Sequence, residues 1–241
     1  YGGDQRLDNK KGLMDSLTTL MKRKHVASYN LDVQVPKETI EKLLHKTWKA
    51  TSSKNNFMPY SVHVLGPDKK EEKILVWNKC VAKQQYSEDQ AAKEGKIKQA
   101  QTIVNPYYNH IKENSYLLIF TARVCDKPTR YVQHSIENGH YAQEMFEDQV
   151  NEIITTTSIE VGMFASHLAL FCMEHDIDVS YTVCMPTLIK NWRNLPFVKH
   201  RPIMLMSLGY GEKYRSQNLQ AQGWKPEDDF KPEINKVVNW V

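Results

Sequence analysis

The sequence predicts one α/β or α+β domain in which helices cover a single sheet. Three observations support this prediction. The chain has 241 residues, 41% hydrophobic and 25% charged, which is typical of a globular domain with a sizeable core. Helix-like segments outnumber strand-like ones, and helices separate the strands. No linker, repeat or low-complexity segment divides residues 1–241, so we expect a single domain whose residues 1–8 are frayed.

The first part of the chain predicts helices around one strand. Residues 8–22 carry apolar side chains on one helical stripe and predict a helix. A second helix begins near Pro36, because proline is favoured in a first helical turn. Its expected apolar face consists of Ile40, Leu43, Leu44 and Trp48. Residues 61–65 alternate as a strand does, a Gly-Pro-Asp turn follows, and the charged stretch 69–112 is mostly helix-forming.

The middle of the chain predicts the core. Residues 115–122 form a compact apolar run typical of a buried strand. Residues 126–133 contain a proline and predict a loop, and 135–150 predict a helix. The most apolar helix is expected over 158–175. Its core positions are Val161, Phe164, Ala165, Leu168, Phe171 and Cys172.

The last part of the chain predicts two further strands. Residues 177–183 and 202–209 are the strand-like segments, and the second ends in glycine. A short helix is expected between them, over 185–194. The tail from residue 226 is acidic and then amphipathic.

Charge and cysteine usage narrow the class of protein. The net charge is only +4, and the Lys-rich stretches are interleaved with Glu and Gln, which predicts solvated helix faces and no nucleic-acid partner. The 4 cysteines form no C-x-x-C pair and predict buried, reduced thiols. No apolar run approaches the ~20 residues of a membrane span, and no signal-peptide pattern opens the chain. We therefore expect a cytoplasmic protein without a membrane partner.

Hydrolytic and metal chemistry find little support. The chain has no G-x-S-x-G motif, and Cys172 and Cys184 lie in apolar runs without a signalled base. The spacing of His134 and His140 differs from H-E-x-x-H, and the Cys172-x-x-His175 pair lacks a second half. We expect no metal site.

Two polar segments at helix boundaries carry the functional signal. Residues 23–25 (Arg-Lys-His) follow the first predicted helix, and residues 52–60 follow the second. Helix ends present unpaired N–H groups, so with cationic side chains the segments form a plausible cradle for a phosphorylated cofactor. Taken singly, Arg23 is better explained as a solvated helix-end charge, and Ser53 and Asn56 are common capping or turn residues.

Four landmarks, in order over almost the whole chain, resemble the FMN-dependent nitroreductase-like family. Residues 23–29 resemble its R-R-S-x-R-x-F segment, and residues 51–60 its (A/S)-P-S-x-x-N-x-Q-P-W segment. The predicted helix 158–175, followed by the strand 177–183, is similar to the family's core helix and flavin-facing strand. Residues 201–210 resemble its K-P-x-x-x-x-x-x-G-Y/H strand.

The resemblance implies an α+β fold whose central, mostly antiparallel sheet is covered by helices, in a homodimer with FMN at the interface. It implies that Arg23 and His25, with Lys24 between them, hold the FMN phosphate. The segment with Ser53 and Asn56 is implied to contact flavin across the dimer. The implied cofactor-binding residues are Arg23, Lys24, His25, Ser52, Ser53, Asn56, His110, Tyr181, Thr182, Val183 and Lys231. Of these, Tyr181, Thr182 and Val183 are implied to run past the isoalloxazine ring.

The chain also departs from the family pattern. Ala27 stands where the family usually has a basic residue near flavin N1 and the C2 carbonyl, and we expect His110 to substitute for it. Ser52 replaces a proline, Met58 a glutamine, and Asp176 a glycine. For the C-terminal phosphate clamp we expect Lys231, with Lys213 and Arg215 as rivals.

The implied activity is transfer of hydride from NADH or NADPH, through flavin N5, to a small organic acceptor such as a nitro compound or quinone. The flavin carries such chemistry, so we name no catalytic side chain. A lid is expected to include Tyr131, His134, Tyr141 and Phe146. The alternatives are specialised flavin chemistry and a non-enzymatic dimeric binding module.

Overall fold

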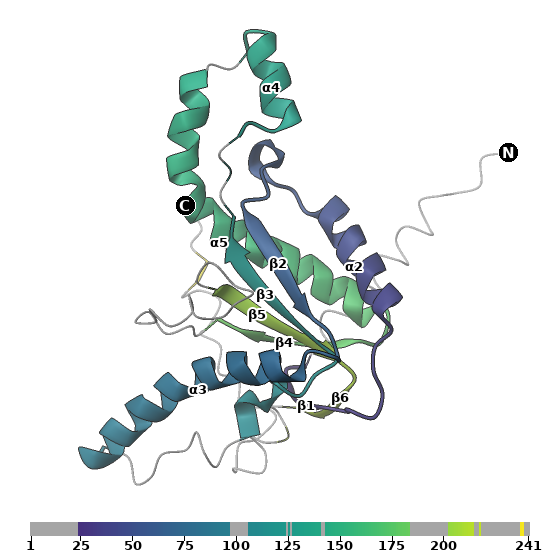
Figure 1. The fold of residues 1–241 in the computed structure, drawn as a ribbon, viewed down its shortest axis with the longest axis vertical. Coiled ribbons are helices and arrows are strands. Elements are labelled where there is room, and N and C mark those ends of the chain that lie inside the picture. Colours follow the sequence, from purple (N-terminus) through teal and green to yellow (C-terminus); the bar gives the residue numbers. More distant parts are fainter. Residues whose placement is uncertain are drawn as a thin grey trace, which may run out of the picture.

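The computed structural model describes residues 24–96, 106–123, 125, 127–140, 143–183, 202–214, 217 and 237–238. Within these residues an antiparallel sheet lies between helices (Figure 1). The elements are β1 (Val26–Tyr29), α2 (Lys37–Ala50), η1 (Lys54–Asn56), β2 (Tyr60–Leu65), α3 (Lys70–Lys93), η2 (Pro106–Ile111), β3 (Tyr116–Ala122), α4 (Arg130–Glu137), α5 (Gln143–Met173), β4 (Asp178–Thr182), β5 (Pro202–Gly209) and β6 (Gly211–Tyr214). The two η elements are short 3₁₀ helices.

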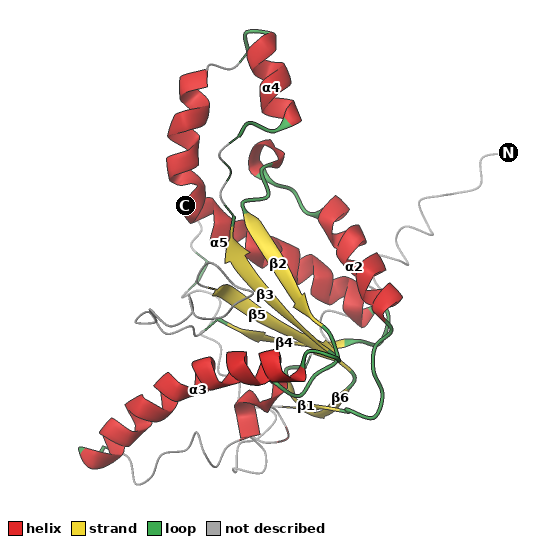
Figure 2. Cartoon of the chain, in the orientation of Figure 1, coloured by secondary structure: helices red, strands yellow, loops and turns green. Residues whose placement is uncertain are grey.

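The main sheet has four strands in the order β2-β3-β5-β4, and each neighbouring pair is antiparallel. A second, two-stranded sheet pairs β1 with β6. The strands lie side by side in the centre of the view with helices around them (Figure 2). The predicted α+β class, with a mostly antiparallel central sheet covered by helices, is confirmed.

The two faces of the main sheet bury separate apolar clusters because successive strand residues point to opposite faces. Leu118 and Phe120 of β3 belong to a cluster with Leu168 of α5. Their neighbours Leu117 and Ile119 belong to a cluster on the other face, which includes Val76 of α3. Helices α2 and α5 therefore cover one face, and α3 with η2 covers the other.

Three helix boundaries differ from the sequence prediction. Residues 130–133, expected to be loop, are the start of α4, because Thr129 Oγ1 caps this helix by accepting a hydrogen bond from Val132 N–H at 3.3 Å. The helix expected over 135–150 is broken between α4 and α5, where Gly139 has a φ of +70°. The predicted core helix extends further towards the N-terminus, over Gln143–Met173.

The side of α2 that is buried was also predicted incorrectly at one position. Trp48 is 53% exposed, and its ring lies 5.7 Å from that of His45. Thr47 is buried in its place, with its hydroxyl donating to Leu43 O at 2.7 Å. That bond satisfies a polar side chain inside the core, which the apolar pattern alone does not anticipate.

One apolar window of α5, Thr156–Met173, is long and apolar enough to cross a membrane, by length and composition only. No such run was predicted from the sequence. Within this window Phe164 and Leu168 are buried in the cluster that covers the sheet, as in the core helix of a globular fold. The helices predicted over 8–22 and 185–194, the tail from 226 except residues 237–238, and Cys184 lie outside the described residues.

Candidate functional site

Three of the predicted cofactor residues meet in the folded chain. His110 Nε2 and Thr182 Oγ1 share a hydrogen bond of 3.0 Å. The rings of His25 and His110 lie edge to face, with centroids 5.6 Å apart. His110 and Thr182 are buried, and His25 is half-buried. We call these three residues the histidine cluster.

The histidine cluster is held by bonds between segments that are distant in the sequence. His25 directly precedes β1, and Ser180 of β4 donates its hydroxyl to Val26 O at 2.8 Å, which fixes β1 beside β4. His110 lies near the end of η2. The Asn114 amide donates to the carbonyls of His110 (2.7 Å) and Ile111 (2.9 Å) and so satisfies the end of this 3₁₀ helix.

Alternation along β4 decides which of its residues join the cluster. The Tyr181 hydroxyl donates to Ala165 O of α5 at 3.3 Å, so this side chain faces α5. Thr182 points to the other face and reaches His110. Val183, just past the strand end, is 62% exposed. Of the predicted flavin-facing triplet, only Thr182 therefore contacts the cluster through its side chain.

The basic residues predicted to hold phosphate are only partly described. Arg23 and Lys231 lie outside the described residues, as does the rival Arg215. Lys24 is exposed, with its Nζ 5.0 Å from the centre of the Tyr214 ring. Ala27 is buried in β1. The phosphate assignment therefore stays a prediction.

The second predicted segment forms a tight loop, residues 52–58, which we call the polar loop. Ser53 Oγ accepts a hydrogen bond from Met58 N–H at 2.7 Å, so this side chain has the turn role that serine commonly takes. Asn55, Asn56 and Met58 have φ values of 53°, 57° and 45°. Positive φ costs energy for residues other than glycine, and such strain clusters at functional sites. Ser52 and Asn56 are exposed.

The strained polar loop is supported by residues that sequence reasoning missed. Buried Glu160 of α5 accepts a hydrogen bond from Lys54 N–H through Oε1 at 3.1 Å. Thr129 donates its hydroxyl to Asn55 O at 2.9 Å. Arg123 donates to Met58 O at 3.1 Å and also to Phe57 O. No local pattern marks these residues, because each acts across a long stretch of chain.

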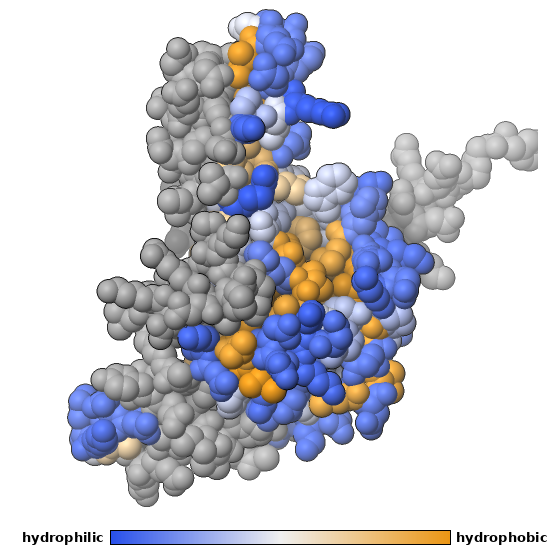
Figure 3. All heavy atoms as spheres, viewed as in Figure 1, coloured by the Kyte–Doolittle hydropathy of each residue, from blue (hydrophilic) through white to orange (hydrophobic). Residues whose placement is uncertain are grey.

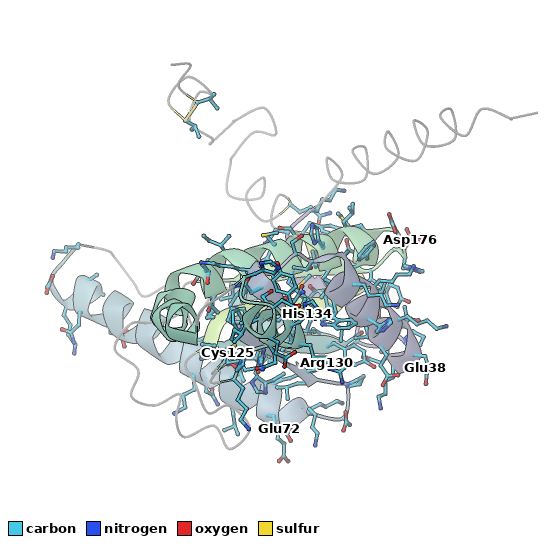
Figure 4. The ribbon with its side chains drawn as sticks, turned by 90° about the horizontal axis from the view of Figure 1, so that it is seen from above. Glu38, Glu72, Cys125, Arg130, His134 and Asp176 are labelled. Carbon is cyan, nitrogen blue, oxygen red and sulfur yellow. The ribbon has the colours of Figure 1, made fainter. Side chains whose placement is uncertain are left out.

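The polar loop and the histidine cluster lie apart within one chain. The polar loop contains η1, just before β2 and near α4, whereas β1 lies at the opposite end of the main sheet (Figure 1). Val132 of α4 packs with Phe57 and Cys125. Figure 4 shows Arg130 and His134 on α4 close to Cys125. Tyr131 and His134 of the predicted lid are thus beside the polar loop, and Tyr131 is 58% exposed.

Burial keeps two thiols and one tyrosine of the core in their neutral forms. Burial raises the pKa of the Cys80 and Cys172 thiols to about 12, so neither is a thiolate at neutral pH. Burial also raises the pKa of Tyr29 well above its ordinary value, and its neutral hydroxyl donates to Ser207 O at 2.8 Å. Among the described residues no group of three or more His, Cys, Asp or Glu side chains is placed to hold a metal.

Solved structures similar to this chain include nitroreductase-like proteins and a candidate FMN oxidoreductase. A nitroreductase-like protein from Streptococcus mutans matches with a TM-score of 0.60 and 15% identity, covering 95% of this chain and 99% of that one. A candidate NAD(P)H:FMN oxidoreductase from Staphylococcus epidermidis matches with a TM-score of 0.60 and 14% identity, over 94% of this chain and 95% of that one. A candidate nitroreductase from Exiguobacterium sibiricum, solved in complex with FMN, matches with a TM-score of 0.56 and 16% identity, over 95% of this chain and 96% of that one. No family model and no curated protein sequence matches the chain.

These matches extend over nearly the whole of both chains in each comparison. The chain therefore has the nitroreductase-like fold, as the four sequence landmarks predicted.

Proposed function

We propose that this chain is an FMN-dependent oxidoreductase that passes hydride from NADH or NADPH to a small organic acceptor such as a nitro compound or quinone. The observation that carries the proposal is the meeting of His25, His110 and Thr182, which were selected from the sequence as cofactor residues. They come together in a chain whose fold matches a structure solved with FMN. We place the protein in the cytoplasm.

The histidine cluster has the polar groups that a flavin phosphate and ring require. The two imidazoles supply ring nitrogens, and neighbouring Ser28 has a buried hydroxyl oxygen with no hydrogen-bond partner among the described residues. A buried polar atom without a partner costs about 1–3 kcal/mol, which a ligand would offset. When bound, FMN would supply two-electron chemistry at N5. In this proposal His110 takes the place of the basic residue missing at Ala27, on the side of flavin N1 and the C2 carbonyl.

We further propose that the protein is a homodimer in which the polar loop completes the partner subunit's flavin site. The polar loop precedes β2 and Thr182 lies on β4, and these strands are the two opposite edges of the main sheet, so we expect the two regions to meet one flavin across a subunit interface. Ile159 and Met163 lie one turn apart on α5 and are 62% and 37% exposed, which gives this helix an outward apolar face.

The first test is a visible absorption spectrum of the purified protein, followed by addition of NADH and then NADPH without oxygen. A flavin band that bleaches with either nucleotide supports the proposed reductase. A flavin band that resists both supports specialised flavin chemistry. Absence of flavin after FMN is supplied would replace the proposal with the non-enzymatic binding module.

Replacing His110 tests the cofactor assignment. His110→Phe keeps a ring of similar size but removes both nitrogens, so FMN affinity should fall about tenfold, as expected for the loss of a good hydrogen bond. The measurement is quenching of FMN fluorescence on titration. His45→Phe, at an exposed position of α2, is the control and should bind FMN normally. Equal affinities in the two variants would remove His110 from the site.

Replacing Ile159 tests the dimer. Ile159→Glu places a charge on the exposed apolar face of α5, so the variant should sediment as a monomer and retain less FMN than the dimeric parent. Val33→Glu, at a loop position that is 51% exposed, is the control and should remain dimeric. A monomeric parent protein that holds FMN would contradict the shared site.

A further inference from the structure

A pocket on the α3 side of the molecule plays no part in the proposed flavin site. Its volume is about 690 Å³, within the range that holds a drug-sized ligand. It is formed by the loop before α2, the turn before α3, the first turns of α3, and residues 112–114 after η2. None of His25, His110 and Thr182 lines it.

The polar part of this pocket favours an anion. Lys70, Lys73 and Lys112 line it together with Asp68 and Glu113. Lys112 pairs with Glu113 at 3.6 Å, and the other three charged residues leave one net positive charge. The pocket also lies at the N-terminus of α3, a helix of 24 residues whose N-cap position makes no side-chain capping bond. The uncapped first-turn N–H groups and the helix dipole add to the preference for negative charge.

One buried side chain of the pocket has a hydrogen-bond acceptor that no described residue satisfies. Asn114 lines the pocket and is 4% exposed. Its amide nitrogen bonds the carbonyls of His110 and Ile111, which fixes the amide orientation. Its Oδ1 has no hydrogen-bond partner among the described residues. A ligand hydroxyl or N–H group would satisfy this oxygen.

The remaining lining is apolar. Leu31, Pro67 and Ile74 contribute hydrocarbon surface, and Leu31 and Ile74 are 49% and 46% exposed. Figure 3 shows apolar surface over α3 among hydrophilic residues. Binding of a ligand whose apolar body covers these atoms is favourable, because it removes apolar surface from water.

We propose that this pocket binds a small organic anion with an apolar body and a hydroxyl group. The anionic group faces Lys70 and the start of α3, the hydroxyl donates to Asn114 Oδ1, and the apolar body covers Ile74 and Leu31. The site is separate from the proposed flavin site, although Asn114 also holds the carbonyl of His110.

The test uses isothermal titration calorimetry with 4-hydroxybenzoate as the probe, on protein saturated with FMN. The variant pair is Ile74→Glu and Leu75→Glu. These residues are neighbours on α3 and are 46% and 44% exposed, but only Ile74 lines the pocket. Both variants add one negative charge to the same helix, so net charge alone cannot distinguish them.

We expect saturable binding to the parent protein, about tenfold weaker binding to Ile74→Glu because of charge repulsion at short range, and unchanged binding to Leu75→Glu. Benzoate, which lacks the hydroxyl, and 4-hydroxybenzyl alcohol, which lacks the anion, should both bind more weakly. No saturable binding, or equal losses in the two variants, would overturn the site. Equal affinity for benzoate would overturn the role assigned to Asn114.

Discussion

Gly209→Ala should destabilise the protein by about 3 kcal/mol, near the upper end of the cost of overpacking a core. A Cβ atom at this position would lie 2.8 Å from Tyr29 Cδ1 and 3.3 Å from the backbone nitrogen of Ser115. Neither neighbour can move easily, because Tyr29 is buried with its hydroxyl bonded to Ser207 O, and Ser115 is fully buried. The measurement is the free energy of unfolding in urea.

The matched control is Gly162→Ala on α5, where a Cβ would meet nothing within 4 Å in its own chain. Because this position adjoins the proposed dimer face, both variants are compared at a concentration at which the protein is monomeric. Alanine is the better helix former, so this variant should be more stable by about 0.5–1 kcal/mol. The two substitutions are chemically identical and should change stability in opposite directions. An unchanged stability of Gly209→Ala would contradict the close packing of β1 on β5.

Lys73→Met should change the pH dependence of stability. Burial lowers the pKa of Lys73 to about 8, from an ordinary value of 10.5, while Nζ donates to the carbonyls of Asn114 (2.9 Å) and Ser115 (3.0 Å). Between these two pH values the unfolded chain binds more protons at this residue than the folded chain, so stability rises with pH. The parent protein should therefore gain on the order of 3 kcal/mol relative to the variant across this window.

The free energy of unfolding in urea is measured for both proteins at about pH 7.5 and about pH 10. These two pH values enclose most of the range between the folded and unfolded pKa of Lys73. Other groups titrate in both proteins and cancel in the difference. Lys37→Met is the control, since Lys37 is exposed on α2 and pairs with Glu41 at 3.5 Å. If the stability difference between the parent and Lys73→Met stays constant with pH, the lowered pKa is wrong.

The long, strongly patterned elements were predictable from local sequence. The apolar run of β3, the segment of β5 and the core stripe of α5 all stand close to where their patterns indicated. Strands β1 and β6 were missed, because each has four residues and its pairing partner lies near the other end of the chain. Short segments carry too little periodicity to be recognised alone.

In the candidate site, too, residue types were predictable from the sequence, whereas the contacts between distant segments were not. His25, His110 and Thr182 were selectable from residue type and resemblance, but their meeting depends on β1 lying beside β4 through the bond from Ser180 to Val26. The supports of the polar loop, Glu160 and Arg123, had no local signal. The pocket beside Lys73 could not be predicted from the sequence either, since its walls come from four separate segments.

Apolar periodicity and residue chemistry were therefore sufficient to predict the α+β class, the core helix and the main strands. These depend on which faces of each element must leave water, and that information is local. The partners of Asn114, the burial of Lys73 and the strain at Asn55 and Asn56 appeared only in the folded chain. Such features arise when distant segments satisfy each other's polar groups, and hydrogen bonding between segments has no period along a sequence.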